Sequence, residues 1–372
     1  MADKETREKF EKIVKKLKAS RKFSALISSE EFFAKYKNIL FLIPLLLEII
    51  SMIPSSAKMF NSKDIAIIGF SLFFVIGYVQ VIGKVLSVLL NIDTIDGIFE
   101  WFRELHRVQE NKLIAGVYAE NLRKIANIGE FVMKLTAFAY GFTTVGFIFS
   151  NTTNQIVFEV PYIAKEFTLI HRLAGSLAYC YNVYNVFLSE CTMIFIGIYF
   201  IGALNILSDV IGKLNESPNI QSAGNLLLPA ILSLHVEILT KFDDFCQVFF
   251  FAFTIQLQTS VILILFNFYL LMQSIMNFFY WATLCSIFAQ FALFCFFGQI
   301  IFNRSERIFT DLYQTKWYEM EISEKKALLL MMKNSQNAFG LKAAGMYDIN
   351  MLMFVQVVKM SFSYCTIMYE LL

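Results

Sequence analysis

Long runs of apolar residues, separated by charged segments, recur along the chain and predict membrane-spanning helices. An apolar run of about 20 residues is long enough to cross the hydrocarbon core as a helix. One block, residues 245–303, contains no Asp, Glu, Lys or Arg and is long enough for two helices joined by a turn at Gln273 and Ser274. Seven spans are therefore predicted, at residues 38–57, 65–90, 135–150, 182–207, two within 245–303, and 349–371.

Composition supports the membrane assignment. Hydrophobic residues make up 57% of the chain and charged residues only 17%, against about 25% charged in an ordinary soluble domain. A soluble protein of this size would need more polar residues to cover its surface. Five prolines in 372 residues suit a helical bundle, in which every backbone group inside the membrane is satisfied within its own helix. The sequence thus predicts an all-α polytopic membrane protein.

The distribution of basic residues predicts the orientation of the bundle. Of the 32 Lys and Arg residues, 24 fall in the N-terminal segment and in the segments at 91–130, 208–244 and 302–348, and four fall in the segments facing the other side. Since Lys and Arg are enriched in cytoplasmic loops, we expect a cytoplasmic N-terminus and an extracellular C-terminus. A G-protein-coupled seven-helix receptor has the opposite orientation, so the charges argue against that class.

Two short segments outside the spans have helical apolar faces. Residues 8–23 are basic, with Phe10, Ile13, Val14 and Leu17 on one face, which fits either a helix on the membrane surface or a solvated cytoplasmic tail. Residues 324–334 carry several Leu and Met residues and are too short to span a membrane. That helix could anchor neighbouring copies to one another, or pack only within its own subunit.

Patterns typical of enzymes or metal sites are missing from the sequence. The three His residues are isolated from one another, and none of the six Cys residues belongs to a CxxC pair, so no metal-ligand spacing is found. No phosphate-binding loop, dinucleotide fingerprint or nucleophile elbow occurs. We therefore expect no catalytic activity, metal, cofactor or nucleic-acid partner. Asn151 begins a glycosylation sequon at the outer end of the third predicted span.

The C-terminal part of the chain carries a more specific pattern. From Trp317 it reads WYEMEISEKKALLLMMKNSQNAFGLKAAGMYDINMLMFVQVVKMSFSYCTIMYELL. This strongly resembles the C-terminal signature of insect odorant receptors: a Trp-Tyr start, an amphipathic helix, a short Gly-containing link opened by Leu341, and a final helix with the Lys-x-Ser-Phe-Ser-Tyr pattern ending at Tyr364. Upstream of Trp317 the chain resembles the family in layout only.

The resemblance implies a ligand-gated, non-selective cation channel in the plasma membrane of olfactory sensory neurons, opened by a small apolar volatile. The family's coreceptor has a larger fourth loop than the segment 208–244, so the chain resembles an odour-specific subunit that forms a heterotetramer with the coreceptor. The expected parts are a cytoplasmic N-terminal segment 1–37, spans and odorant pocket 38–303, a cytoplasmic anchor 304–348 and a pore helix 349–372. A gustatory-type homotetrameric channel stays open as an alternative, and a G-protein-coupled receptor as a weaker one.

The last predicted helix has one face suited to a pore. At 100° per residue, five residues fall on this face, polar at the inner end and apolar at the outer end: Gln356, Met360, Ser363, Ile367 and Leu371. A ring of apolar side chains can close a pore by dewetting. By resemblance, Ile367 and Leu371 match the family's outer gate. The Glu370 carboxylate beside it would attract cations, or it is simply the solvated end of the helix.

The odorant pocket is expected where aromatic residues gather in the outer half of the spans, because burial and shape supply most of the binding energy of an apolar ligand. Glu48 and Glu190 are carboxylates inside predicted spans. Glu190 could orient a polar group of the ligand, although a structural hydrogen bond is the simpler explanation of both. The candidate ligand-binding residues are Phe70, Phe74, Gly77, Tyr140, Thr144, Phe147, Tyr184, Phe187, Cys191, Phe278 and Phe279.

Overall fold

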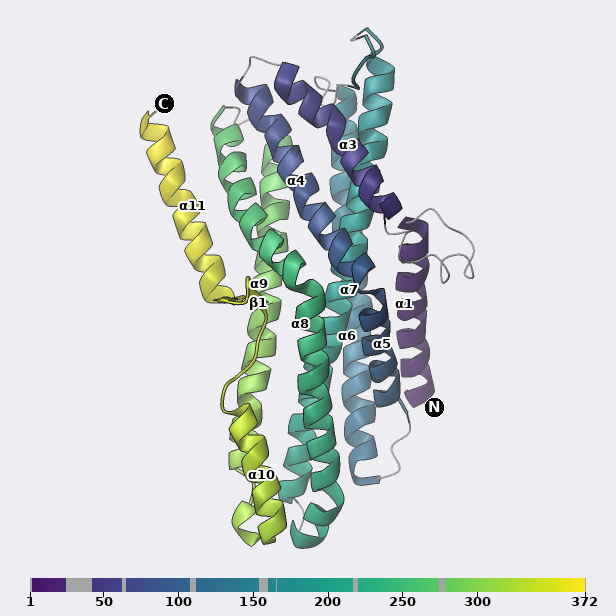
Figure 1. Cartoon of the computed structure of the whole chain (residues 1–372), viewed down its shortest axis with the longest axis vertical. Coiled ribbons are helices and arrows are strands. Elements are labelled where there is room, and N and C mark those ends of the chain that lie inside the picture. Colours follow the sequence, from purple (N-terminus) through teal and green to yellow (C-terminus); the bar gives the residue numbers. More distant parts are fainter. Residues whose placement is uncertain are drawn as a thin grey trace.

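The computed structural model describes residues 2–24, 42–61, 65–107, 112–153, 160–164, 166–216, 220–273 and 278–371, apart from some side chains near the ends of these segments. Helices run lengthwise in an elongated bundle (Figure 1). In chain order the elements are α1 (Ala2–Ser24), α3 (Leu42–Asn61), α4 (Ile65–Leu90), α5 (Ile92–Leu105), α6 (Lys112–Thr153), α7 (Thr168–Glu216), α8 (Ile220–Gln273), α9 (Phe278–Tyr313), η1 (Trp317–Glu319), α10 (Ile322–Ser335), β1 (Lys342–Ala343), β2 (Tyr347–Asp348) and α11 (Met351–Leu371).

The fold class predicted from the sequence is confirmed: the chain is an all-α protein with several membrane-spanning helices. Within the described residues, α6, α7, α8 and α9 each contain a stretch long and apolar enough to cross a membrane, and α4 with α5, bent by 66° at their junction, forms a fifth candidate. The predicted span 65–90 coincides with α4, and α8 ends at Gln273, where the hairpin turn was expected. Two further predicted spans correspond to α3 and α11.

The segment 208–244, predicted as a loop, is almost entirely helical. Helix α7 continues to Glu216 and α8 begins at Ile220. Apolar residues in these extensions, such as Val210, Leu214 and Ile238, are buried in the core, while the charged residues that suggested a loop lie on the other faces. Both helices are therefore much longer than a membrane crossing, and their extensions form the end of the bundle where α10 lies (Figure 1).

Helix α1 behaves differently from either expectation. Its apolar residues Phe10, Ile13, Val14 and Leu17 are buried in the main core, where α1 packs against α6 and α7. The Phe10 ring lies 5.1 Å from the ring of Tyr199 on α7. The predictions of a membrane-surface helix and of a solvated tail are thus both wrong, because the bundle itself provides an apolar surface for this face.

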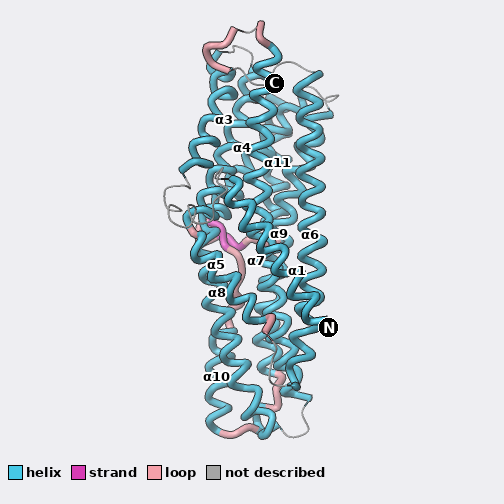
Figure 2. The backbone as a smooth tube through the Cα atoms, turned by 90° about the vertical axis from the view of Figure 1, so that its right-hand side faces the viewer, coloured by secondary structure: helices cyan, strands magenta, loops and turns pink. Residues whose placement is uncertain are grey.

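The segment between α9 and α11 combines a capped helix with a small hairpin. Helix α10 begins with a capping box between Glu321 and Glu324; it buries Leu328 and Met331 and leaves Leu329 and Leu330 exposed. The antiparallel strands β1 and β2 follow, and they lie at mid-height of the molecule (Figure 2). From this hairpin α11 leans away from the other helices toward the end opposite α10 (Figure 1).

Candidate functional site

An aromatic cluster lies between four helices in the half of the bundle toward which α11 points. It consists of Phe74 and Tyr78 on α4, Phe147 on α6, and Tyr179 on α7, with Met52 of α3 packed against it. The rings of Phe147 and Tyr179 stack at 3.9 Å, and Phe74 meets Phe147 edge-on at 5.9 Å. Phe74 and Tyr78 share one face of α4 because they are four residues apart. The cluster provides a large apolar surface with a few polar tips.

Several of the predicted pocket residues lie in or next to this cluster. Phe74 and Phe147 belong to it, and Tyr140 and Phe187 form a ring contact at 6.0 Å on the same two helices, α6 and α7. Thr144 donates a hydrogen bond to the Tyr140 carbonyl oxygen. Around Gly77, a side chain would meet open space. The structure thus brings four predicted aromatic residues toward the interior where α4, α6 and α7 meet.

Other predicted pocket residues are placed elsewhere. Tyr184 donates its hydroxyl to the Ser20 carbonyl oxygen of α1, at 3.1 Å, and Cys191 is fully buried in the main core. The side chains of Phe70, Phe278 and Phe279 lie outside the described residues. Sequence reasoning missed Tyr78 and Tyr179, which belong to the cluster together with Phe74 and Phe147. The spacing of four residues from Phe74 could have identified Tyr78.

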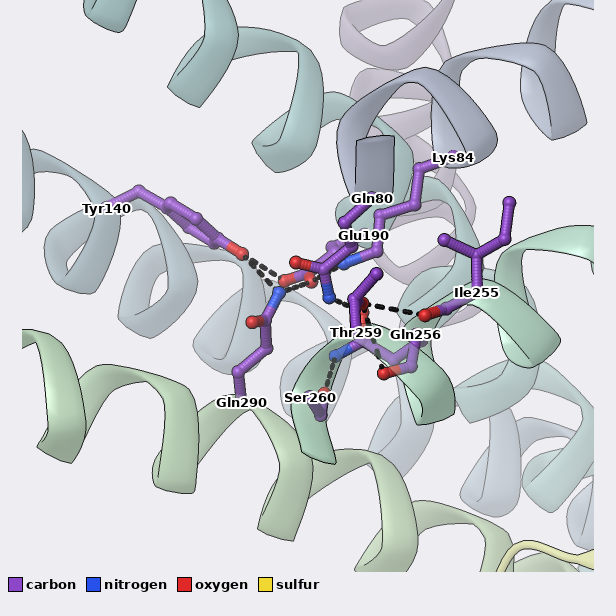
Figure 3. Close-up of polar contacts among 9 residues, drawn as sticks. All are labelled: Gln80, Lys84, Tyr140, Glu190, Ile255, Gln256, Thr259, Ser260 and Gln290. Carbon is purple, nitrogen blue, oxygen red and sulfur yellow. Dashed lines mark hydrogen bonds and ion pairs between the residues drawn. The ribbon is translucent and has the colours of Figure 1, made fainter. Parts of the chain in front are cut away.

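Directly next to the aromatic cluster is a polar network centred on Glu190 of α7 (Figure 3). Lys84 of α4 places its Nζ 2.6 Å from Glu190 Oε1. The hydroxyl of Tyr140 donates to Glu190 Oε2, and the amide of Gln290 on α9 donates to Glu190 Oε1. On the other side, Gln80 donates to Gln256 of α8 at 2.6 Å. We refer to these residues, with Ser260, which accepts from Gln256, as the polar network.

The burial of two opposite charges explains why the polar atoms of the network form so many hydrogen bonds. Lys84 and Glu190 are both buried, and a buried ion pair is tolerated only where further hydrogen bonds satisfy its remaining polar atoms. Glu190 receives donors from three other helices, α4, α6 and α9. A cavity of about 10 Å³ beside Lys84, Ser189 and Gln256 has room for about one water molecule. The network therefore fixes these helices to one another below the aromatic cluster.

Glu48 belongs to a second buried set of hydrogen bonds. Its carboxylate accepts from the side-chain amides of Asn185, at 2.7 Å, and Asn182, at 3.2 Å. The prediction that Glu48 and Glu190 make structural hydrogen bonds is confirmed. For Glu48 the bonds join α3 to α7, so all the helices around the aromatic cluster are linked by buried polar contacts.

Helix α9 connects the polar network to α11. Gln290 belongs to the network, and Phe288 and Phe291 on the same helix lie 6.5 and 5.8 Å, ring to ring, from Phe354 of α11. A second contact joins Phe268 of α8 to Phe362 of α11 at 5.0 Å. Packed aromatic rings thus connect α9, which carries part of the network, directly to α11.

The predicted pore face of α11 points away from its own bundle. Gln356, Met360, Ser363 and Ile367 are exposed, and Ile367 is 49% exposed. The buried residues of α11, Met353, Val357 and Ser361, form a stripe beside the pore face, and Met353, seven residues before Met360, lies in line with that face at the inner end of the helix. The side chains of Glu370 and Leu371 lie outside the described residues.

Asn151, the predicted glycosylation residue, is 1% exposed. Its amide donates to the Arg172 carbonyl oxygen and to the Ser176 hydroxyl, both at 3.0 Å. Glycosylation stays a prediction, and it would require the release of both bonds. Within the described part of the chain, no three His, Cys, Asp or Glu residues are grouped so that they could hold a metal ion.

Comparison with known proteins places this architecture. The insect olfactory receptor OR5 from Machilis hrabei has the same fold, with a TM-score of 0.79 and 13% identity; the match covers 97% of this chain and 98% of that one. A second structure, of the same receptor in complex with eugenol, gives a TM-score of 0.77 and 12% identity; the match covers 98% of this chain and 100% of that one. No curated protein sequence matches the chain significantly. The sequence model described as 7tm Odorant receptor matches residues 64–362, most of the chain, and the chain therefore belongs to this odorant receptor family.

Proposed function

We propose that the chain is the odour-binding subunit of a ligand-gated, non-selective cation channel that assembles with the odorant receptor coreceptor as a heterotetramer in the plasma membrane of olfactory sensory neurons. The observation that carries the proposal is the aromatic cluster, closed below by the polar network, in a protein of the odorant receptor family. A small apolar volatile would bind among the aromatic rings, where burial supplies most of its affinity.

The chemistry of the cluster supports such a ligand. Its walls are aromatic, and the hydroxyl of Tyr78, which is 2% exposed, has no hydrogen-bond partner among the described residues. A ligand oxygen could accept a bond from this hydroxyl and relieve the cost of leaving it unpaired. The open space at Gly77, less than one helical turn from Phe74, would leave room for part of the ligand. OR5, which shares the fold, was solved with eugenol.

The exposed face of α11 supports the channel part of the proposal. Met360 and Ile367 are apolar and exposed in a single chain, as expected of residues that other subunits cover. Four copies of this face around one axis would place Ile367 and Leu371 in an apolar ring that closes the pore by dewetting, with Glu370 beside it to draw in cations. The exposed Leu329 and Leu330 on α10 would contact neighbouring subunits within the anchor 304–348.

Ligand binding would open the channel through α9. A ligand that fits better when α9 moves relative to α7 favours that state, since a ligand shifts an equilibrium only by its differential affinity. The contacts of Phe288 and Phe291 with Phe354 would carry this movement to α11. The outer end of α11, the predicted pore helix 349–372, then moves outward. Water enters the widened apolar ring, and the pore can conduct ions.

The test is electrical recording from cells that express the chain with and without the coreceptor, against a panel of volatiles. We expect odour-evoked cation current only from the pair. Phe147→Ala should raise the half-maximal ligand concentration about tenfold or more, because about 2 kcal/mol of aromatic contact is lost. Phe131→Ala, at a residue of the same helix that is largely exposed, is the matched control and should leave the response unchanged.

Two results would contradict the proposal. Robust odour-evoked current from the chain alone would favour a gustatory-type homotetramer. An N-terminal tag that antibodies reach on intact cells would reverse the predicted orientation and favour a G-protein-coupled receptor.

A further inference from the structure

A groove of about 550 Å³ lies between α8 and the segment that leads from α10 into α11. Its volume falls within the range of small-molecule sites, about 300–1,000 Å³. None of the residues that line it belongs to the aromatic cluster or to the polar network. The groove is thus a separate feature, and the proposed odorant site does not account for it.

The groove combines two opposite charges with aromatic rings. Asp243 of α8 and Lys342 of β1 both line it. The amide of Gln247, which also lines the groove, donates to Asp243 Oδ2 at 2.8 Å and orients the carboxylate. Among its aromatic lining residues, Phe250 and Phe251 are 39% and 66% exposed, and their rings meet edge-on at 5.7 Å.

The position of the groove along α8 coincides with the edge of the apolar block. The charged residues Lys241, Asp243 and Asp244 precede Phe245, and no charged residue follows until after Asn303. The groove, lined by α8 residues 239–251, therefore crosses the boundary between the hydrocarbon core and the headgroup region. The density of basic residues on this side of the boundary marks it as the cytoplasmic face.

The hairpin after β1 holds the groove at a fixed width. Gly345 has a φ of +69°, a conformation that favours glycine, and its turn passes close to the Phe250 ring: a Cβ at Gly345 would lie 3.8 Å from it. The backbone N–H of Ala344 donates to the Thr254 hydroxyl of α8 at 2.9 Å. Because the hairpin is bonded to α8, Lys342 and Phe250 belong to one preformed surface.

We propose that this groove binds one zwitterionic phospholipid of the cytoplasmic leaflet. The Lys342 ammonium contacts the phosphate, the Asp243 carboxylate contacts the headgroup amine, and an acyl chain lies along Phe250 and Phe251. A lone basic residue would favour an anionic headgroup, but Asp243 repels a headgroup that has no cation of its own. An apolar surface of a second receptor copy would leave both charges without a function, so the lipid is the better fit.

Native mass spectrometry of the full-length receptor tests the proposal. The receptor is released from nanodiscs that contain phosphatidylethanolamine and phosphatidylglycerol in equal amounts, and retained lipid is counted. We expect the wild type to retain phosphatidylethanolamine. Lys342→Gln and Asp243→Asn should each retain about fivefold less of it, because each loses a contact of about 1 kcal/mol. Lys333→Gln, at an exposed lysine of α10 outside the groove, should retain as much lipid as the wild type.

Preferential retention of phosphatidylglycerol, or equal retention by all variants, would overturn the proposal. A second measurement replaces Phe251 by a photo-crosslinking diazirine amino acid and identifies the adduct by mass. A phospholipid adduct is expected. An adduct with a second receptor chain would mean that the groove is an interface between copies. All of these variants alter exposed side chains, and a monodisperse elution profile confirms that each one folds.

Discussion

At the scale of single residues, the pair formed by Lys84 and Glu190 has the largest energetic consequences. Both side chains are buried among apolar helices, where an uncompensated charge is costly. Lys84→Met leaves the Glu190 carboxylate without its cation, and breaking a buried pair in this way costs about 3–5 kcal/mol. We expect a marked drop in the midpoint temperature of thermal unfolding of the detergent-purified receptor, measured by fluorescence-detected size-exclusion chromatography.

The double variant Lys84→Met/Glu190→Gln separates the charge from the packing. It removes both charges and keeps the hydrogen-bond acceptor for Tyr140, so it should recover most of the lost stability. Lys134→Met is the matched control, since the pair that Lys134 forms with Glu130 is largely exposed and such pairs are worth about 0–1 kcal/mol. A double variant as unstable as Lys84→Met would show that the lysine stem, not the charge pair, matters there.

At the scale of elements, the junction of α9 with α11 depends on one glycine. A Cβ added at Gly298 would overlap the backbone carbonyl of Ile349, which cannot rotate away as a side chain could. Gly298→Ala should therefore displace the start of α11 and abolish odour-evoked current in cells that express the complete channel. Gly116→Ala on α6, where a Cβ meets nothing within 4 Å, should leave the current intact. Normal current from Gly298→Ala would show that the seating of α11 is adaptable.

The docking of α1 can be tested in the same way. Phe10 is fully buried, with ring contacts to His106, Phe195 and Tyr199. Phe10→Ala should cost about 3–5 kcal/mol and free α1 from the bundle, so that an N-terminal tag becomes sensitive to limited proteolysis in permeabilised cells. Lys15→Ala, on the exposed face, serves as the control. Equal protease resistance in both variants would contradict docking of α1 as part of the core.

At the scale of the whole molecule, apolar runs predicted the elements well and the tertiary contacts poorly. The bounds of α4 could be predicted because charged residues flank an apolar run in which Lys84 is the one charged residue. The extensions of α7 and α8 were mistaken for a loop because their charges obscure a buried stripe that includes Val210 and Ile238. The contact of Lys84 with Glu190 joins residues 106 positions apart. No periodicity in the sequence relates them, so the network could only be found in the fold.

The gate involves every subunit, and its prediction belongs to the assembled channel. If exposed Ile367 residues meet around a pore, a polar side chain there holds water in the closed ring and removes the dewetting barrier. Ile367→Ser should then raise the basal current of the co-expressed channel several-fold and reduce the relative response to odour. Phe362→Ser is the control, because Phe362 contacts Phe268 of its own chain and lies off the pore face; it should weaken the response without raising basal current. Unchanged basal current and odour response in Ile367→Ser, and also in Leu371→Ser, would show that this face of α11 does not form the gate.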